Sequence, residues 1–325
     1  MSTDIYREVL IIFYPVFFCL SISCQAVLLY VIFFYSPKNL KTLKTILAST
    51  CIFQVMLIVV CCFSQFRMIS TSVPIELRSY GPCRYLEAWM GYACYQLLQT
   101  SAFLSGMTII VTFYFKYEAV RSIEPSNCRV FKAIMIFYLP IIVSLVMEII
   151  MVVTQSLPPD VRFKYEQLNQ DVSEYSIIGA LSLKTLPSII NFSLISGSVV
   201  FAPFISFFFR NKILSRINSQ LDKSSQVKKS QNRVFVKGLT IQAFLPLIFY
   251  VPVFGLYFYC ILTHAEILFQ QYFMTVVPAL PAFFDPLLTL YFVTPYRRRM
   301  KIWMRIEQES KIFPVATSNV FRNSM

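Results

Sequence analysis

The sequence has few charged residues and almost no histidine. Charged residues account for 14% of its 325 residues, and His264 is its one histidine. Soluble domains carry about 25% charged residues, so a water-soluble globular fold explains this composition poorly. No spacing typical of metal ligands is present, and so few His, Asp and Glu side chains leave little from which to build an active site. We therefore expect no enzymatic activity, no bound metal and no cofactor.

Apolar residues, in contrast, make up 57% of the chain and occur in long runs, with a mean hydropathy of +0.62. A helix needs roughly 20 apolar residues to cross about 30 Å of hydrocarbon, and seven runs qualify. They predict an all-α membrane protein, with residues 1–325 forming a single bundle of seven transmembrane helices. The 17 prolines suggest that several of these helices are kinked. The predicted spans are residues 9–35, 45–63, 88–115, 133–153, 185–209, 238–262 and 272–294.

The basic residues, which give a net charge of +13, lie between the apolar runs and mostly on one side. Connections on that side contain 22 Lys and Arg residues, against 7 on the other. Positive charge is retained in the cytoplasm, which predicts an exterior amino terminus and a cytoplasmic tail at 295–325. Within the tail, residues 296–308 are amphipathic, as in a helix lying on the membrane surface. We expect the basic residues to meet an anionic inner leaflet and not a nucleic acid.

Two acidic residues lie within the predicted spans, where an unpaired charge is costly. Glu148, in the fourth span, either lines an outward pocket for a basic or hydroxylated ligand or bonds to a neighbouring helix. Asp285, in the seventh span, precedes Pro286 and follows Pro278 and Pro281. Three prolines this close together interrupt the helical hydrogen bonds. The segment is either a switch with more than one bent form or a static kink.

Polar side chains of the third span are further candidates. Gln96, Gln99 and Thr100 are three and four residues apart, so they are predicted to share one helix face. They either contact a ligand in a central cavity or form hydrogen bonds between helices. Gln54 and Asn191 carry the same two alternatives.

Cys83 lies just before the third span, on the predicted exterior side, where disulfides form. The longest exterior loop, residues 154–184, contains no cysteine with which it could pair. Candidate partners near the same side are Cys260, Cys61 and Cys62. A free buried thiol is the alternative.

Five short motifs occur in order along nearly the whole chain: SPKNL at 36–40, QFR at 65–67, GPC at 81–83, DP at 285–286 and PYR at 295–297. Together they resemble the serpentine chemoreceptors of nematodes, most closely serpentine receptor class delta. The motifs of rhodopsin-like receptors fit less well, because the third span ends in Phe-Lys-Tyr-Glu without the acidic-Arg-Tyr triplet.

The resemblance implies a chemosensory receptor of the plasma membrane that detects a small external molecule and signals to a heterotrimeric G protein. The ligand would bind in an outward cavity among the third to seventh spans. Neither the ligand nor the oligomeric state follows from it. The residues expected to face the G protein are Lys116, Arg121, Arg210, Arg216, Lys237 and Arg297.

The alternative function is a multi-span transporter or a subunit of a ligand-gated channel. Such proteins commonly show paired intramembrane charges or repeated halves. Neither feature is visible in this sequence, which favours the receptor.

Overall fold

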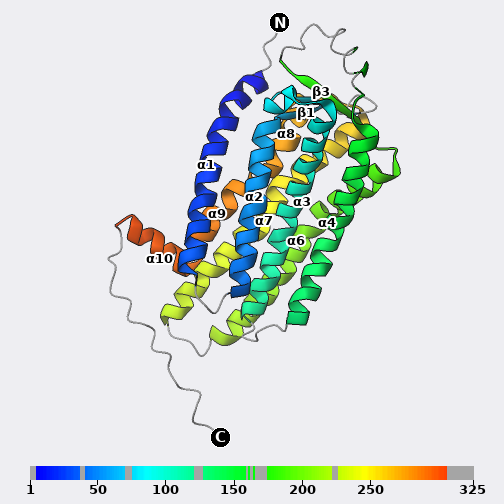
Figure 1. Ribbon diagram of the computed structural model, residues 1–325. Coiled ribbons are helices and arrows are strands. Elements are labelled where there is room, and N and C mark those ends of the chain that lie inside the picture. Colours follow the sequence, from blue (N-terminus) through cyan, green and yellow to red (C-terminus); the bar gives the residue numbers. More distant parts are fainter. Residues whose placement is uncertain are drawn as a thin grey trace.

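The computed structural model describes residues 5–36, 41–69, 75–120, 127–158, 160–161, 164, 174–221 and 226–305. Within these ranges, seven helical segments are long and apolar enough to cross a membrane. They form one elongated bundle, with α1 beginning at one end and α10 lying at the other (Figure 1). The predicted seven-helix transmembrane fold is therefore confirmed.

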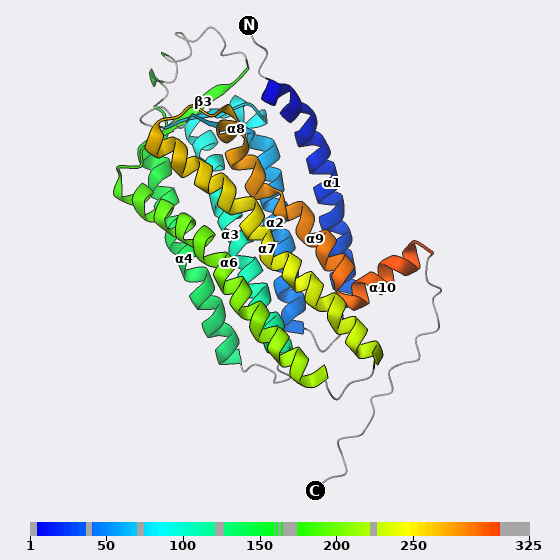
Figure 2. The same cartoon turned by 180° about the vertical axis from the view of Figure 1, so that it is seen from behind.

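Six of the spans are single helices that include or closely match the predicted segments. They are α1 (Ile5–Tyr35), α2 (Lys41–Ser64), α3 (Ala88–Val120), α4 (Asn127–Gln155), α6 (Leu186–Leu221) and α7 (Gln226–Thr263). Both α6 and α7 continue well beyond their apolar runs at the end of the bundle where α10 lies (Figure 2). The extension of α6 still packs on the bundle through Ile213 and Ile217, which are buried with Ile109 and Phe113 of α3.

The seventh span is broken at two of the three predicted prolines, Pro278 and Pro281, whereas Pro286 lies inside a continuous helix. This span consists of α8 (Leu268–Val276), the short 3-10 helix η3 (Val277–Ala279) and α9 (Pro281–Phe292). Pro278 and Pro281 lack the N–H groups that a continuous helix would use, which explains the break. A further helix, α10 (Thr294–Trp303), turns away from the bundle axis, as the amphipathic tail predicted.

A small sheet covers the end of the bundle where α1 begins, and the sequence did not predict it. Its strands are β1 (Phe66–Ile69), β2 (Ile75–Ser79) and β3 (Ser176–Leu181), antiparallel in the order β1-β2-β3. Buried and half-buried residues alternate along β1 and β2, as in a sheet with one face on a core. We call the end of the bundle that this sheet covers the sheet end.

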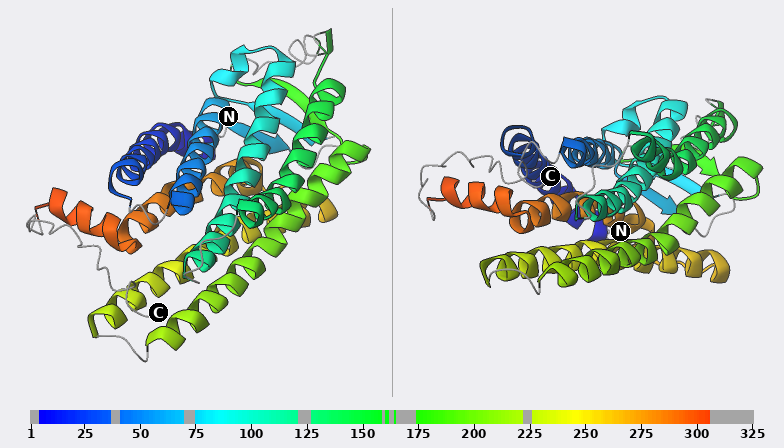
Figure 3. Two further views of the ribbon diagram at one scale, coloured as in Figure 1. Left: turned by 60° about the horizontal axis from the view of Figure 1, so that its bottom comes forward. Right: turned by 90° about the horizontal axis from the view of Figure 1, so that it is seen from below.

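The core of the bundle is formed around α3. Helix α3 packs against α2, α4 and α6, and 67% of its apolar stretch is buried, against 22% for α4. The exposed apolar side chains of α4 therefore suit contact with lipid. Seen along the bundle, α6 and α7 run side by side and α10 projects outward (Figure 3).

Candidate functional site

A cavity opens between α3, α6 and α7 in the half of the bundle nearest the sheet. The empty space within it, including the part that is open to the surface, amounts to about 1050 Å³. Met68 of β1 and Leu181 of β3 contribute to the wall, so the sheet closes part of it. Six aromatic side chains also line it: Tyr95, Phe103, Phe192, Tyr250, Phe254 and Tyr257.

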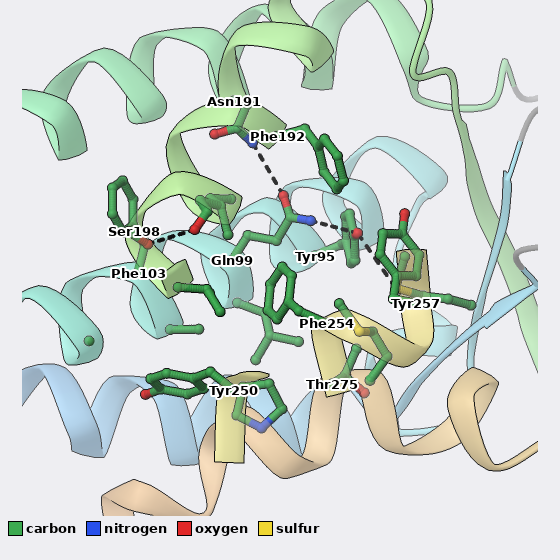
Figure 4. Close-up of a pocket in the computed structure, with 18 of the residues that line it drawn as sticks. Tyr95, Gln99, Phe103, Asn191, Phe192, Ser198, Tyr250, Phe254, Tyr257 and Thr275 are labelled. Carbon is green, nitrogen blue, oxygen red and sulfur yellow. Dashed lines mark hydrogen bonds between the residues drawn. The ribbon is translucent and has the colours of Figure 1, made fainter. Parts of the chain in front are cut away.

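Two amide side chains provide a polar patch in this wall. Gln99 Nε2 donates a hydrogen bond of 2.6 Å to the Tyr95 hydroxyl. Asn191 Nδ2 donates one of 3.3 Å to Gln99 Oε1 (Figure 4). None of the described residues that line the cavity is Asp, Glu, Lys or Arg. The cavity therefore offers aromatic surface and amide hydrogen bonds, without a counter-charge.

Of the four predicted ligand-binding residues, only Gln99 lines the cavity. Its neighbours in the wall recur along α3 at three- and four-residue intervals and define a single helix stripe. Thr100 directly follows Gln99, so its side chain points about 100° away from that of Gln99 around the helix axis. Thr100 and Gln96 are both buried outside the wall, so only Gln99 of this predicted face reaches the cavity.

Glu148 does not line the cavity either; it bonds to a neighbouring helix, which is the second of the two alternatives that the sequence left open. The Thr100 hydroxyl donates to Glu148 Oε2, and the Ser144 hydroxyl lies 3.3 Å from Glu148 Oε1. Ser144 Oγ also lies 2.5 Å from Asn191 Oδ1. The carboxyl group is thus placed behind the amide pair of Asn191 and Gln99, and it interacts with Asn191 both directly and through the Ser144 hydroxyl.

A second polar cluster lies deeper in the bundle and is centred on Asp285. Gln54 Nε2 and Gln242 Nε2 donate to its two carboxylate oxygens at 3.2 and 3.0 Å. Lys116 Nζ donates to Gln242 Oε1 at 2.7 Å, and Gln25 Nε2 donates to Gln54 Oε1 at 2.8 Å. We call these five residues the Asp285 network, which joins α1, α2, α3, α7 and α9.

The network corrects two expectations from the sequence. Lys116 was predicted to face the G protein, but it is 6% exposed and points into the bundle. The predicted span stopped at residue 115, whereas α3 continues to Val120, so Lys116 and Glu118 are buried charged side chains in addition to Glu148 and Asp285. No role was predicted for Gln242. The signal that could have identified it is its position as an isolated polar residue within an apolar run.

The other predicted G-protein-facing residues have mixed settings. Arg216 and Lys237 are exposed on the extensions of α6 and α7, and Arg210 is half-buried on α6. Arg297 is half-buried on α10, and Arg121 lies outside the described residues. A basic surface therefore remains at the end of the bundle opposite the sheet.

All nine cysteines lie in the described part of the chain, and all are free. Cys83 is buried in the short 3-10 helix η2 (Pro82–Tyr85), just before α3. Its thiol interacts with that of Cys94, a residue that the sequence did not suggest as a partner. The candidates Cys61, Cys62 and Cys260 form no disulfide with it.

Comparison with known proteins places this architecture in one family. A family model described as "Serpentine type 7TM GPCR chemoreceptor Srd" matches residues 10–302. The chain is 69% identical over 317 residues to Serpentine receptor class delta-40 of Caenorhabditis elegans, covering 98% of this chain and 99% of that protein. It is 40% identical over 313 residues to Serpentine receptor class delta-44, covering 96% and 97%. The chain therefore belongs to the Srd family of serpentine seven-transmembrane chemoreceptors.

Proposed function

We propose that this chemoreceptor binds a small external molecule in the cavity and signals to a heterotrimeric G protein at the opposite end of the bundle. The sheet end would then face the exterior of the plasma membrane. This orientation follows from the basic side chains at the other end, among them Arg216, Lys237 and Arg297.

The observation that carries the proposal is that the cavity reaches the break in the seventh span. Thr275 at the end of α8 and Pro278 of η3 both belong to the cavity wall. Asp285, the centre of the Asp285 network, is seven residues further along the same span. A ligand in the cavity would thus contact the broken part of the seventh span, and the Asp285 network lies further along the same span.

Helix α7 connects the same two places. Its residues Tyr250, Phe254 and Tyr257 line the cavity, and Gln242 lies two turns from Tyr250 in the Asp285 network. The same helix carries the exposed Lys237. A ligand that binds one packing of α7 and the seventh span more tightly would shift the population toward that packing. The surface formed by the extensions of α6 and α7 would change with it.

Co-expression with a promiscuous G protein tests the signalling step. Cells that carry the receptor at their surface are screened with volatile and water-soluble compounds, and intracellular calcium is recorded. We expect at least one compound to act through the receptor, with no response in cells that lack it. A screen without any hit, with normal surface expression, would count against the proposal.

Topology and current measurements separate the receptor from the transporter or channel alternative. Tags at the two ends should be accessible from opposite sides, with the amino-terminal tag outside. A carboxyl-terminal tag accessible on intact cells would exclude the proposed orientation. A ligand-gated current that persists when G proteins are blocked would instead support a channel subunit.

A further inference from the structure

We infer that the cavity takes an uncharged, elongated, mainly apolar molecule that presents a carbonyl-type acceptor to the side-chain amide of Gln99. The inference rests on the proposed function, because it takes this cavity as the ligand site. Three properties of the wall carry it: its lack of charge, the direction of its amide hydrogen bonds and its length.

The lack of charge disfavours an ionic ligand. Burying a charged group without a partner carries a large desolvation cost, and no described residue of the wall supplies a counter-charge. Glu148 is the nearest buried carboxyl group identified beside the wall, and it is occupied by Thr100 and Ser144. Aromatic faces such as Tyr250 and Phe254 can also attract cations, so an organic ammonium ion is the main competing ligand.

The direction of the hydrogen bonds favours a ligand that accepts. Because Asn191 Oδ1 lies against Ser144 Oγ, its Nδ2 group is turned toward Gln99. Gln99 Oε1 receives that N–H, and Gln99 Nε2 in turn donates to Tyr95. Each amide nitrogen has two hydrogens and uses one in these contacts, and the Asn191 side chain also interacts with Glu148. The second N–H of Gln99 is therefore the hydrogen-bonding capacity that this patch can offer to a carbonyl oxygen.

The wall is long in one direction. On α6 it extends from Ser188 to Ala202, which corresponds to about 21 Å along a helix at 1.5 Å per residue. On α3 it extends from Tyr95 to Met107, or about 18 Å. The amide patch lies on the sheet side of Met107 and Ala202, which leaves apolar wall beyond it. A polar head with a hydrocarbon tail matches this layout better than a compact molecule.

Binding to the purified receptor tests the inference without any signalling step. The probes are methyl ketones of graded chain length, together with the alkane, primary amine and carboxylic acid that match the best ketone in length. Binding is measured as a rise in unfolding temperature at increasing probe concentration. We expect affinity to increase with chain length and then stop, and the ketone to bind more tightly than the alkane, amine or acid. Tighter binding of the amine or the acid, or no binding by any probe, would overturn the inference.

Matched pairs of variants test how the two ends of the cavity contribute to ketone binding. Gln99→Leu should weaken ketone binding about tenfold and leave alkane binding nearly unchanged, because it removes one hydrogen bond. Gln96→Leu, one turn away and outside the wall, is the control. Ala202→Phe should abolish binding of the long ketones and spare the short ones, whereas Val200→Phe, on the exposed face of α6, should do neither. Equal effects within either pair would refute the assignment.

The outcomes also separate this inference from the proposed function. Ketone binding that depends on Gln99, without any G-protein response, would retain the ligand class and reject the signalling role. A G-protein response to charged compounds alone would retain the receptor and reject the ligand class.

Discussion

The Asp285 network places two side chains of opposite formal charge inside the bundle, with an amide between them. Gln242 accepts from the Lys116 ammonium at 2.7 Å and donates to the Asp285 carboxylate at 3.0 Å. Lys116 and Asp285 are 6% and 8% exposed. Each charge is therefore compensated through the same glutamine, and the two should be energetically coupled. A double-mutant cycle of Lys116→Met and Asp285→Asn measures this coupling.

The expected magnitudes follow from the burial of the pair. Hydrogen bonds to charged groups contribute about 1.5–3 kcal/mol each, and loss of one partner leaves the other charge buried without compensation. Each single variant should therefore lower the free energy of unfolding by about 2–3 kcal/mol. The double variant leaves neither charge behind, so it should be more stable than either single variant. The coupling free energy, which is the sum of the two single effects minus the effect of the double variant, should therefore exceed about 2 kcal/mol.

Two assays measure the effects of the single and double variants. Thermal unfolding of the purified receptor in detergent gives the order of stability, and basal G-protein signalling gives the balance between helix packings. Because the network joins five helices in the observed packing, each single variant should change basal signalling and the double variant should bring it back toward the native level. Lys237→Met is the control, since Lys237 is exposed and its loss should change stability by no more than about 0.5 kcal/mol. Additive destabilisation in the double variant would refute the coupling.

Two further predictions concern the sheet end. Gly179→Ala should destabilise the receptor by about 1–3 kcal/mol, because a Cβ there would lie 2.2 Å from Tyr92 Cδ2; Gly197→Ala, which meets nothing within 4 Å, is the control, and equal unfolding temperatures would contradict the packing argument. Mild oxidation should join Cys83 to Cys94, whose thiols interact, and peptide mapping without reduction should find that pair. A disulfide from Cys83 to any other cysteine would contradict the observed arrangement.

The sequence was sufficient for the spans and for the break in the seventh, because both depend on local properties. Apolar runs of sufficient length specify membrane crossings, and prolines remove backbone donors wherever the chain goes. The break at Pro278 and Pro281 needed no knowledge of neighbouring helices. The sheet was missed because β1, β2 and β3 are only four to six residues long and pair across large separations in the sequence.

The site was less predictable because it depends on how each helix is rotated about its axis. Gln99 and Thr100 are adjacent in sequence, yet one lines the cavity and the other bonds to Glu148. Lys116 directly follows an apolar run and is charged, as loop residues often are. Helix α3 continues past it, however, and its side chain bonds to Gln242. These residues were candidates because their side chains are polar. Only the packing of the helices decided what each of them contacts.

The cavity wall and the Asp285 network differ in a way that bears on how such a receptor could serve many ligands. The cavity wall contains no described ionic side chain, whereas the Asp285 network holds Asp285 and Lys116 within hydrogen-bonding distance of one amide. Exchanging apolar side chains such as Phe254 would reshape the cavity without altering that charge balance. Changing Gln242 would instead disturb the network whatever the ligand. Because the cavity ends at Pro278 and the network lies beyond it, ligand preference is free to change while the element proposed to switch the receptor is preserved.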